Sequence, residues 1–235
     1  MRHIRIVLSA LLFLLPLSNL AVAMEYEEGT HYVELQIPLN TRNPDKIEVA
    51  EYFSYGCPHC YQFETMISAW HAGLPADVEF SRTPAIWNKS YQTYAQTYFT
   101  LISLKSLDKA HTAVFNAIHS EGRRLDSPQA MAGYLAEFGI APEDFAKAYN
   151  SFGVRASVQQ ADSKGKAYRS GGVPAIIVNG KYRIEGGMAG SNANMIRVAD
   201  YLIEKERQQM AANGVNINHI ALSGGCLRYN IVGCV

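Results

Sequence analysis

The sequence predicts an α/β fold in which two β-rich segments pair across a helical insertion. Lys46–Ser54 and Val173–Ile184 are rich in β-branched and aromatic residues, and apolar residues alternate along the first of them. Between these segments, residues 91–169 carry apolar residues at helical spacing. Neither β-rich segment could form a stable sheet alone, so both are expected in one sheet.

The first 23 residues have the pattern of a secretory signal peptide. Arg2 and Arg5 precede an apolar run from Ile6 to Leu17, and Ala21-Val22-Ala23 is typical of a cleavage site. We therefore expect residues 1–23 to be removed after export. The alternative is an uncleaved membrane anchor, for which the apolar run is short.

Composition limits the possible partners. The chain has 21 basic and 21 acidic residues, and loss of Arg2 and Arg5 would leave a net charge of 19 − 21 = −2. No basic surface is implied, so nucleic acid is not an expected partner. Four cysteines in an exported chain agree with an oxidising compartment.

The expected chain starts with an extended arm at Tyr26–Tyr32 and a short edge strand at Val33–Ile37. In the following strand, Lys46–Ser54, the period of two places Glu51 on the same face as apolar residues. A carboxylate that is buried there without a partner would have a raised pKa.

The segment Cys57-Pro58-His59-Cys60 is predicted to begin a helix that ends near His71. Pro58 suits the first helical position, where no N–H is needed. The helix N-terminus favours a thiolate at Cys57, and His59 adds a donor or a positive charge beside it. Cys57 is therefore the candidate reactive thiol, and Cys60 is its disulfide partner.

A C-x-x-C pair is also found as half of a structural zinc site. Such a site needs a second pair at suitable spacing, whereas Cys226 and Cys234 are separated by seven residues in a polar, glycine-containing segment. Redox chemistry is therefore favoured, with no metal or cofactor.

After a short strand at Val78–Phe80, helices are expected. Ser127-Pro128 begins one, and another runs from Pro142 through Phe152 to a stop at Gly153. Val154–Arg169 is expected to be a longer helix.

β-branched and other strand-forming residues are again frequent in Val173–Ile184, which predicts β structure there. Asn179-Gly180 is a strong signal for a two-residue hairpin turn. A last helix is predicted over Asn192–Met210. The predicted division is residues 24–88 and 163–211 for the sheet domain, 89–162 for the helical insertion and 212–235 for a tail.

The tail carries Cys226 and Cys234, which we predict to form a disulfide in an oxidising compartment. This bond would either stabilise a folded tail or only protect two reactive thiols. A redox relay between this pair and Cys57–Cys60 is the third alternative.

The order of elements and three segments of sequence resemble the bacterial DsbA family of periplasmic thiol:disulfide oxidases. These segments are FSYGCPHCYQFE from Phe53, GVPAIIVNGKY from Gly172, and Asn150-Ser151-Phe152. The resemblance covers roughly Tyr26–Met210 and implies a thioredoxin-like fold with an inserted helical domain. Residues 212–235 depart from the usual family pattern.

The resemblance also implies roles for individual residues. A substrate thiolate would attack Cys57, and His59 would stabilise the Cys57 thiolate. Glu51 and Glu64 would lie near Cys60 and help to move its proton, with Arg82 as a possible partner. A solvent-exposed Glu64 is the alternative.

The Val173–Pro174 bond would be cis, which leaves the Val173 backbone free to pair with an extended substrate. The sequence alone would favour a trans proline at the start of an edge strand.

The resemblance implies a monomeric periplasmic enzyme that donates its Cys57–Cys60 disulfide to unfolded, newly exported proteins. A DsbB-like, quinone-linked membrane oxidase would regenerate the disulfide. The alternatives are a disulfide isomerase or reductase, a holdase, and a zinc-binding module. A dimerisation module typical of isomerases would not fit before the first long strand.

Overall fold

The structure is a computed structural model that describes residues 26–222, with side chains described as far as residue 212. Its centre is a five-stranded mixed sheet in the order β1-β5-β4-β2-β3. The central strand β2 is parallel to β3 and antiparallel to β4. The strands are β1 Val33–Glu34, β2 Ile47–Phe53, β3 Val78–Pro84, β4 Ala175–Val178 and β5 Tyr182–Glu185.

The pairing of β2 with β4 confirms that the two β-rich segments share one sheet across the helical insertion. The turn between β4 and β5 is also confirmed: Asn179 and Gly180 both have positive φ, and the Lys181 N–H donates to the Val178 carbonyl at 2.9 Å. Helices α1 Pro58–Ala72, α7 Gly186–Ala189 and α8 Asn192–Leu222 belong to the sheet-containing part.

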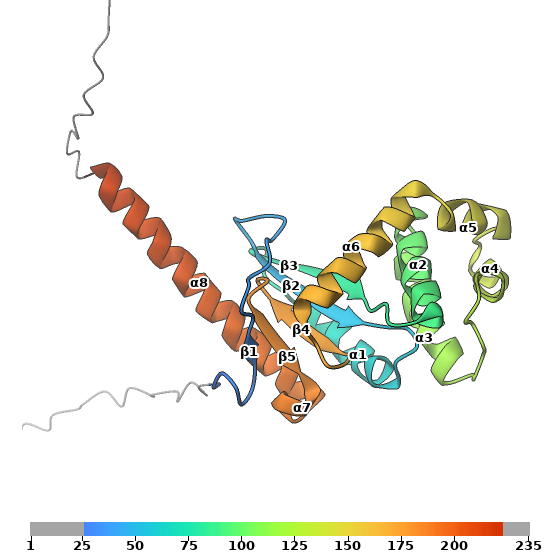
Figure 1. Cartoon of the computed structure of the whole chain (residues 1–235), viewed down its shortest axis with the longest axis horizontal. Helices are drawn as coiled ribbons and strands as arrows, with labels where there is room; N and C mark the ends of the chain where they lie inside the picture. Colours follow the sequence, from blue (N-terminus) through green and yellow to red (C-terminus); the bar gives the residue numbers. More distant parts are fainter. Residues whose placement is uncertain (1–25, 223–235) are drawn as a thin grey trace, which may run out of the picture.

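The insertion between β3 and β4 contains α2 Lys89–Ser103, α3 Leu107–His119, α4 Pro128–Leu135, a 3₁₀ turn at Ala136–Phe138, α5 Pro142–Tyr149 and α6 Phe152–Tyr168. Helices α2–α5 form a body beside the sheet, and α6 extends from that body back over it (Figure 1). The division expected after residue 162 falls inside α6, which is continuous there.

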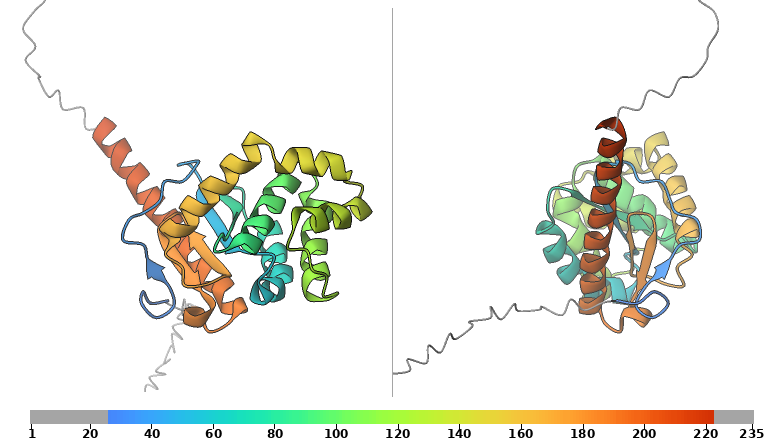
Figure 2. Two further views of the ribbon diagram at one scale, coloured as in Figure 1. Left: turned by 45° about the vertical axis from the view of Figure 1, so that its right-hand side comes forward. Right: turned by 90° about the vertical axis from the view of Figure 1, so that its left-hand side faces the viewer.

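Both faces of the sheet are covered, so every residue of β2 is buried. One face packs against α1 and α8 through a cluster that includes Val49, Phe63 and Leu202. The other face packs against the end of α6, where Tyr52 meets Tyr168. Figure 2 shows α8 crossing the sheet and continuing well beyond it.

Two predicted helix boundaries are wrong. Helix α8 continues to Leu222 instead of ending at Met210, so Gly214 lies within the helix and does not end it. The helix expected to include Phe152 ends at Tyr149. The Ser151 hydroxyl caps a new helix by accepting from the Val154 N–H at 3.3 Å, which leaves Phe152 82% exposed in the first turn.

The N-terminal arm also differs from the prediction. It is not an extended segment, because residues 29–31 form a turn in which the Gly29 N–H donates to the Tyr32 carbonyl at 2.8 Å. Tyr26 and Tyr32 are buried and pack beside α8 and β5. The signal peptide and the Cys226–Cys234 disulfide lie outside the described residues.

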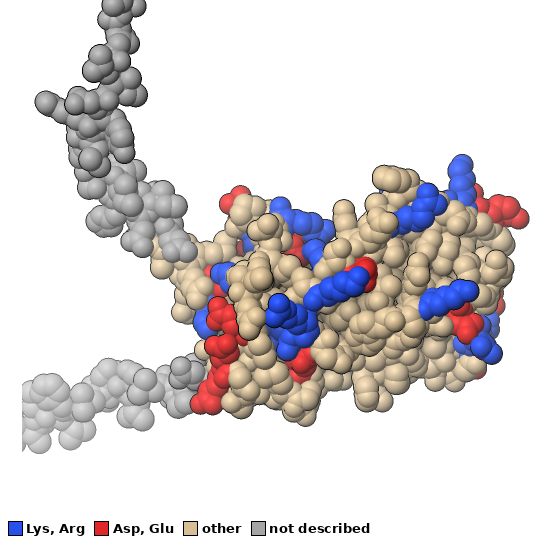
Figure 3. Space-filling model, in the orientation of Figure 1, with Lys and Arg blue, Asp and Glu red and all other residues tan. Residues whose placement is uncertain are grey.

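Basic and acidic side chains are interspersed across the face in Figure 3. No helix within residues 26–222 combines the length and the apolar character that a bilayer crossing requires.

Candidate active site

The loop from β2 to α1 places Cys57 at the N-cap of α1 and Cys60 in its first turn. The Cys57 N–H donates to the Ser54 carbonyl at 3.1 Å, and the Cys57 Sγ accepts from the Cys60 N–H at 3.4 Å. Gly56 is required here, because a Cβ would lie 2.7 Å from the Tyr94 ring. Both cysteines are thiols, so the structure describes the reduced dithiol.

The two thiols have opposite acidities. Hydrogen bonding from the Cys60 thiol, aided by backbone N–H groups of Cys60 and His59 and by the charge of His59, lowers the pKa of Cys57 to about 6. Burial, followed by the effects of Cys57 and Glu51, raises the pKa of Cys60 well above its usual value. The motif therefore holds one thiolate and one thiol near neutral pH.

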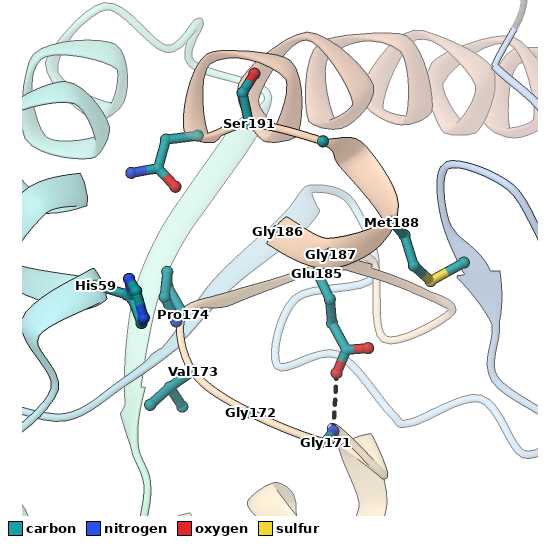
Figure 4. Close-up of a pocket in the computed structure, with 12 residues that line it drawn as sticks. His59, Gly171, Gly172, Val173, Pro174, Glu185, Gly186, Gly187, Met188 and Ser191 are labelled. Carbon is teal, nitrogen blue, oxygen red and sulfur yellow. Dashed lines mark hydrogen bonds between the residues drawn. The ribbon is translucent and has the colours of Figure 1, made fainter.

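The Val173–Pro174 peptide is cis, as the resemblance implied. The Cys57 Sγ lies 3.2 Å from the Val173 carbonyl oxygen, which places the redox turn beside the start of β4. A groove of about 520 Å³ continues from this point along residues 171–174 and 185–192, with His59 at its edge. Figure 4 shows His59 beside Pro174, and Glu185 accepting a hydrogen bond from the Gly171 N–H across the groove wall.

Behind the dithiol lies a buried cluster of charges. The Arg82 Nε donates to the Glu51 Oε2 at 2.7 Å, and the Arg82 guanidinium lies 3.3 Å from the Glu64 Oε2. Glu51 is fully buried and Glu64 is 4% exposed, so the alternative of a solvated Glu64 is wrong. Glu51 is buried as expected, but it is paired with Arg82 rather than isolated.

The environments of the two carboxyl groups differ. Burial, opposed by Arg82 and assisted by the charge of Glu64, raises the pKa of Glu51 to about 7. Although burial alone would raise the pKa of Glu64, hydrogen bonding and charge from His111, together with Arg82 and Ser68, bring it below its usual value. Near neutral pH, Glu51 is thus the carboxyl group that can carry a proton.

Sequence reasoning missed two members of this cluster, Tyr55 and His111. The His111 Nδ1 lies 2.7 Å from the Tyr55 hydroxyl, and its Nε2 lies 3.3 Å from the Glu64 Oε2. The only signal in the sequence is that His111 follows Ala110 on the apolar stripe of α3, where a buried histidine needs polar partners.

A C-x-x-C at a helix N-terminus, a preceding central strand and an adjacent cis X-Pro peptide define a thioredoxin-like dithiol protein. Residues 76–202 match a family model described as a DSBA-like thioredoxin domain. The chain is 48% identical over 179 residues to the thiol:disulfide interchange protein DsbA of Azotobacter vinelandii, covering 76% of this chain and 84% of that protein.

The protein of the same name from Pseudomonas aeruginosa is 44% identical over 203 residues, which cover 86% of this chain and 96% of the relative. A crystal structure of Pseudomonas aeruginosa DsbA superposes with a TM-score of 0.77 at 45% identity, covering 79% of this chain and 97% of that chain. The chain therefore belongs to the DsbA family and is a thiol:disulfide oxidoreductase. The predicted thioredoxin-like fold with a helical insertion is confirmed.

Proposed function

We propose that this protein oxidises newly exported proteins by donating the Cys57–Cys60 disulfide. The observation that carries the proposal is the contrast between the two thiols, since Cys57 is held as a thiolate beside the groove while Cys60 is fully buried. Stabilising the Cys57 thiolate favours the reduced enzyme, and this makes the disulfide a strong oxidant. The DsbA family is itself a known example of a low cysteine pKa combined with a strongly oxidising disulfide.

The reaction takes two exchanges. A substrate thiolate attacks the Cys57 Sγ, so that a Cys57–substrate disulfide forms, the Cys57–Cys60 bond breaks, and Cys60 leaves as a thiolate. A second thiolate of the same substrate then attacks the substrate sulfur that is bonded to Cys57. The substrate disulfide forms, the mixed disulfide breaks, and Cys57 is released as a thiolate. The substrate loses two electrons to form its disulfide, and the enzyme gains them as a dithiol.

Cys60 requires a proton when it leaves, because burial raises its pKa well above neutral pH. Glu51 supplies that proton, because its pKa of about 7 lets it carry one near neutral pH and its charge raises the pKa of Cys60. Pro58 starts the helix, His59 supports the Cys57 thiolate, and Glu64 with Arg82 adjusts Glu51.

The groove beside Cys57 holds the substrate as an extended strand along Val173. The protein acts as a monomer in the periplasm after removal of residues 1–23. A DsbB-like, quinone-linked membrane oxidase restores the disulfide. The domain division at residues 88, 162 and 211 and the Cys226–Cys234 bond remain predictions.

A difference in stability between the two redox forms tests the proposal. The pKa of Cys57 falls from 9.0 in the unfolded chain to about 6 in the folded protein. The folded thiolate therefore stabilises the reduced form fully above pH 9, and this contribution is lost as pH falls through about 6. The oxidised form has no such thiolate. The free energy of unfolding of the reduced form, minus that of the oxidised form, is therefore expected to decrease steadily from pH 9 to pH 6.

Denaturant unfolding of both forms across this pH range measures the difference. A Cys57→Ala variant is the control, because it lacks the thiolate and should lose that pH dependence. Parallel stability curves for the two redox forms of the unsubstituted protein would contradict a thiolate-driven oxidant.

A further inference from the structure

The buried cluster behind the dithiol extends into the helical insertion. His111 comes from α3, is 5% exposed, and touches both Tyr55 and Glu64 through its two ring nitrogens. Its ring also packs edge-on against Phe53 and Phe115. A histidine held at both nitrogens in an apolar environment has a fixed orientation and a defined tautomer.

The partners determine which nitrogen carries the hydrogen. Glu64 accepts from the Ser68 hydroxyl at 2.6 Å and from Arg82, as an ionised carboxylate does. The His111 Nε2 must therefore carry the hydrogen that faces Glu64. Its Nδ1 is then an acceptor, and the Tyr55 hydroxyl donates to it.

The two carboxyl groups that bind Arg82 receive different numbers of hydrogen bonds. Glu64 has donors from α1, α3 and β3, namely Ser68, His111 and Arg82. Among the described residues, Glu51 accepts a hydrogen bond only from Arg82, and its Oε1 is buried without a partner. Hydrogen bonds to the charged form favour ionisation, so one proton shared by the pair is placed on Glu51.

We propose that His111 is a positioning residue that holds Glu64 ionised through its Nε2–H and so keeps the shared proton on Glu51, next to Cys60. The helical insertion thus contributes directly to the proton transfer that accompanies disulfide donation. This inference deepens the proposed function and rests on the proton transfer from Glu51 to Cys60.

The charged and titratable groups around Glu51 support a role for His111 in deciding which carboxyl group holds the proton. Apart from burial, the pKa of Glu51 reflects Arg82 on β3 and Glu64 on α1. Alongside burial, Glu51 in turn raises the pKa values of Cys60 on α1, Tyr55 in the loop after β2 and Tyr98 on α2. His111 on α3 is coupled to Glu64 and Arg82, so it reaches Glu51 through them. Loss of the His111 donor would increase the proton affinity of Glu64. The proton would then move to Glu64, and Arg82 would pair more strongly with an ionised Glu51.

Two substitutions of His111 test the proposal. His111→Phe keeps the aromatic packing and removes the Nε2–H, whereas His111→Gln retains an amide donor toward Glu64. The readout is the rate at which reduced glutathione forms a mixed disulfide with the oxidised enzyme, expressed per glutathione thiolate, from pH 5 to pH 9. In the unsubstituted protein this rate falls as Glu51 loses its proton.

His111→Phe should reduce the rate near pH 7 by about tenfold, the value expected for loss of one hydrogen bond to a charged group. The fall should also occur at lower pH, with the pKa of Cys57 unchanged. His111→Gln should restore most of the unsubstituted profile. An unchanged profile in His111→Phe, or equal losses in the two variants, would overturn the proposal.

A double substitution separates this inference from the proposed function. In a Glu64→Gln background, His111→Phe should have no further effect on the profile, because its target is absent. If Glu51→Gln leaves the original profile unchanged, the proton-transfer step itself is wrong. If Glu51→Gln changes the profile and His111→Phe does not, only the role of His111 fails.

A measurement on the unsubstituted protein does not depend on the folding of any variant. Nitrogen-15 NMR should show His111 as neutral imidazole with hydrogen on Nε2 from pH 6 to pH 8. Hydrogen on Nδ1 alone, which would leave Nε2 without a hydrogen to donate, would exclude His111 as the donor that holds Glu64 ionised.

Discussion

Arg82→Met is expected to lower the free energy of unfolding by about 3–5 kcal/mol at neutral pH. Arg82 is the only cation hydrogen-bonded to Glu51 among the described residues, and it also donates to Glu64 and Ser68. Removal of the guanidinium would leave two carboxyl groups buried without their counter-charge. Methionine retains part of the side-chain volume, so packing loss is limited and the effect reports mainly on charge.

The pH dependence identifies this cause. Without Arg82, the pKa of Glu51 in the folded protein rises further above its usual value, and the pKa of Glu64 rises from its lowered value. A raised folded pKa gives stability that is present below the unfolded pKa and is lost as pH rises through the folded pKa. The deficit of Arg82→Met should therefore be small near pH 4 and should grow toward pH 8.

Arg207→Met is the matched control, since Arg207 also pairs with a carboxylate, Asp77, at 2.7 Å. That pair is 39% and 44% exposed, so its loss should cost less than about 1 kcal/mol. Denaturant unfolding of the three proteins at several pH values measures both effects. Equal losses at Arg82 and Arg207 would contradict a buried charge cluster.

Cys57→Ser is expected to abolish the oxidation of reduced substrates, because a serine oxygen cannot form the exchangeable disulfide. The groove beside Val173 is left in place, so binding of an unfolded, thiol-free peptide should persist. Oxidation of a reduced model protein and fluorescence binding of the peptide measure the two properties separately.

Cys60→Ser is the control for Cys57→Ser. It also lacks the internal disulfide, but it retains Cys57 at the N-cap beside the Val173 carbonyl. With oxidised glutathione added as the disulfide donor, this variant should accumulate mixed disulfides at Cys57, whereas Cys57→Ser should not. Retained oxidase activity in Cys57→Ser would exclude Cys57 as the reacting thiol, and loss of all peptide binding would exclude a preformed groove.

Local patterns in the sequence were enough to predict much of the fold. The alternation in β2 correctly placed Glu51 on a buried face, and Asn179-Gly180 predicted the hairpin that pairs β4 with β5. The helix that begins after Cys57 followed from Pro58 and the helix-capping position. These predictions succeed because each depends on residues that are neighbours along the chain.

Predictions fail where distant contacts or competing caps decide the outcome. Tyr55 and His111 are far apart in the sequence, and no local pattern shows that they meet in the core. Phe152 fits an apolar stripe continued from α5, but the cap at Ser151 starts a new helix and turns the ring to solvent. The pairing of Glu51 and Arg82 was anticipated only through a family resemblance.

The position of β4 has a consequence for how the enzyme is made. Val49 pairs with Val178, so the whole helical insertion must be synthesised and brought back before Val173 can reach Cys57. Closing so long a segment has an entropic cost, and non-local strand pairing slows folding. During synthesis the C-x-x-C therefore emerges well before its groove, and its chemistry is coupled to substrate recognition only once the chain is nearly complete.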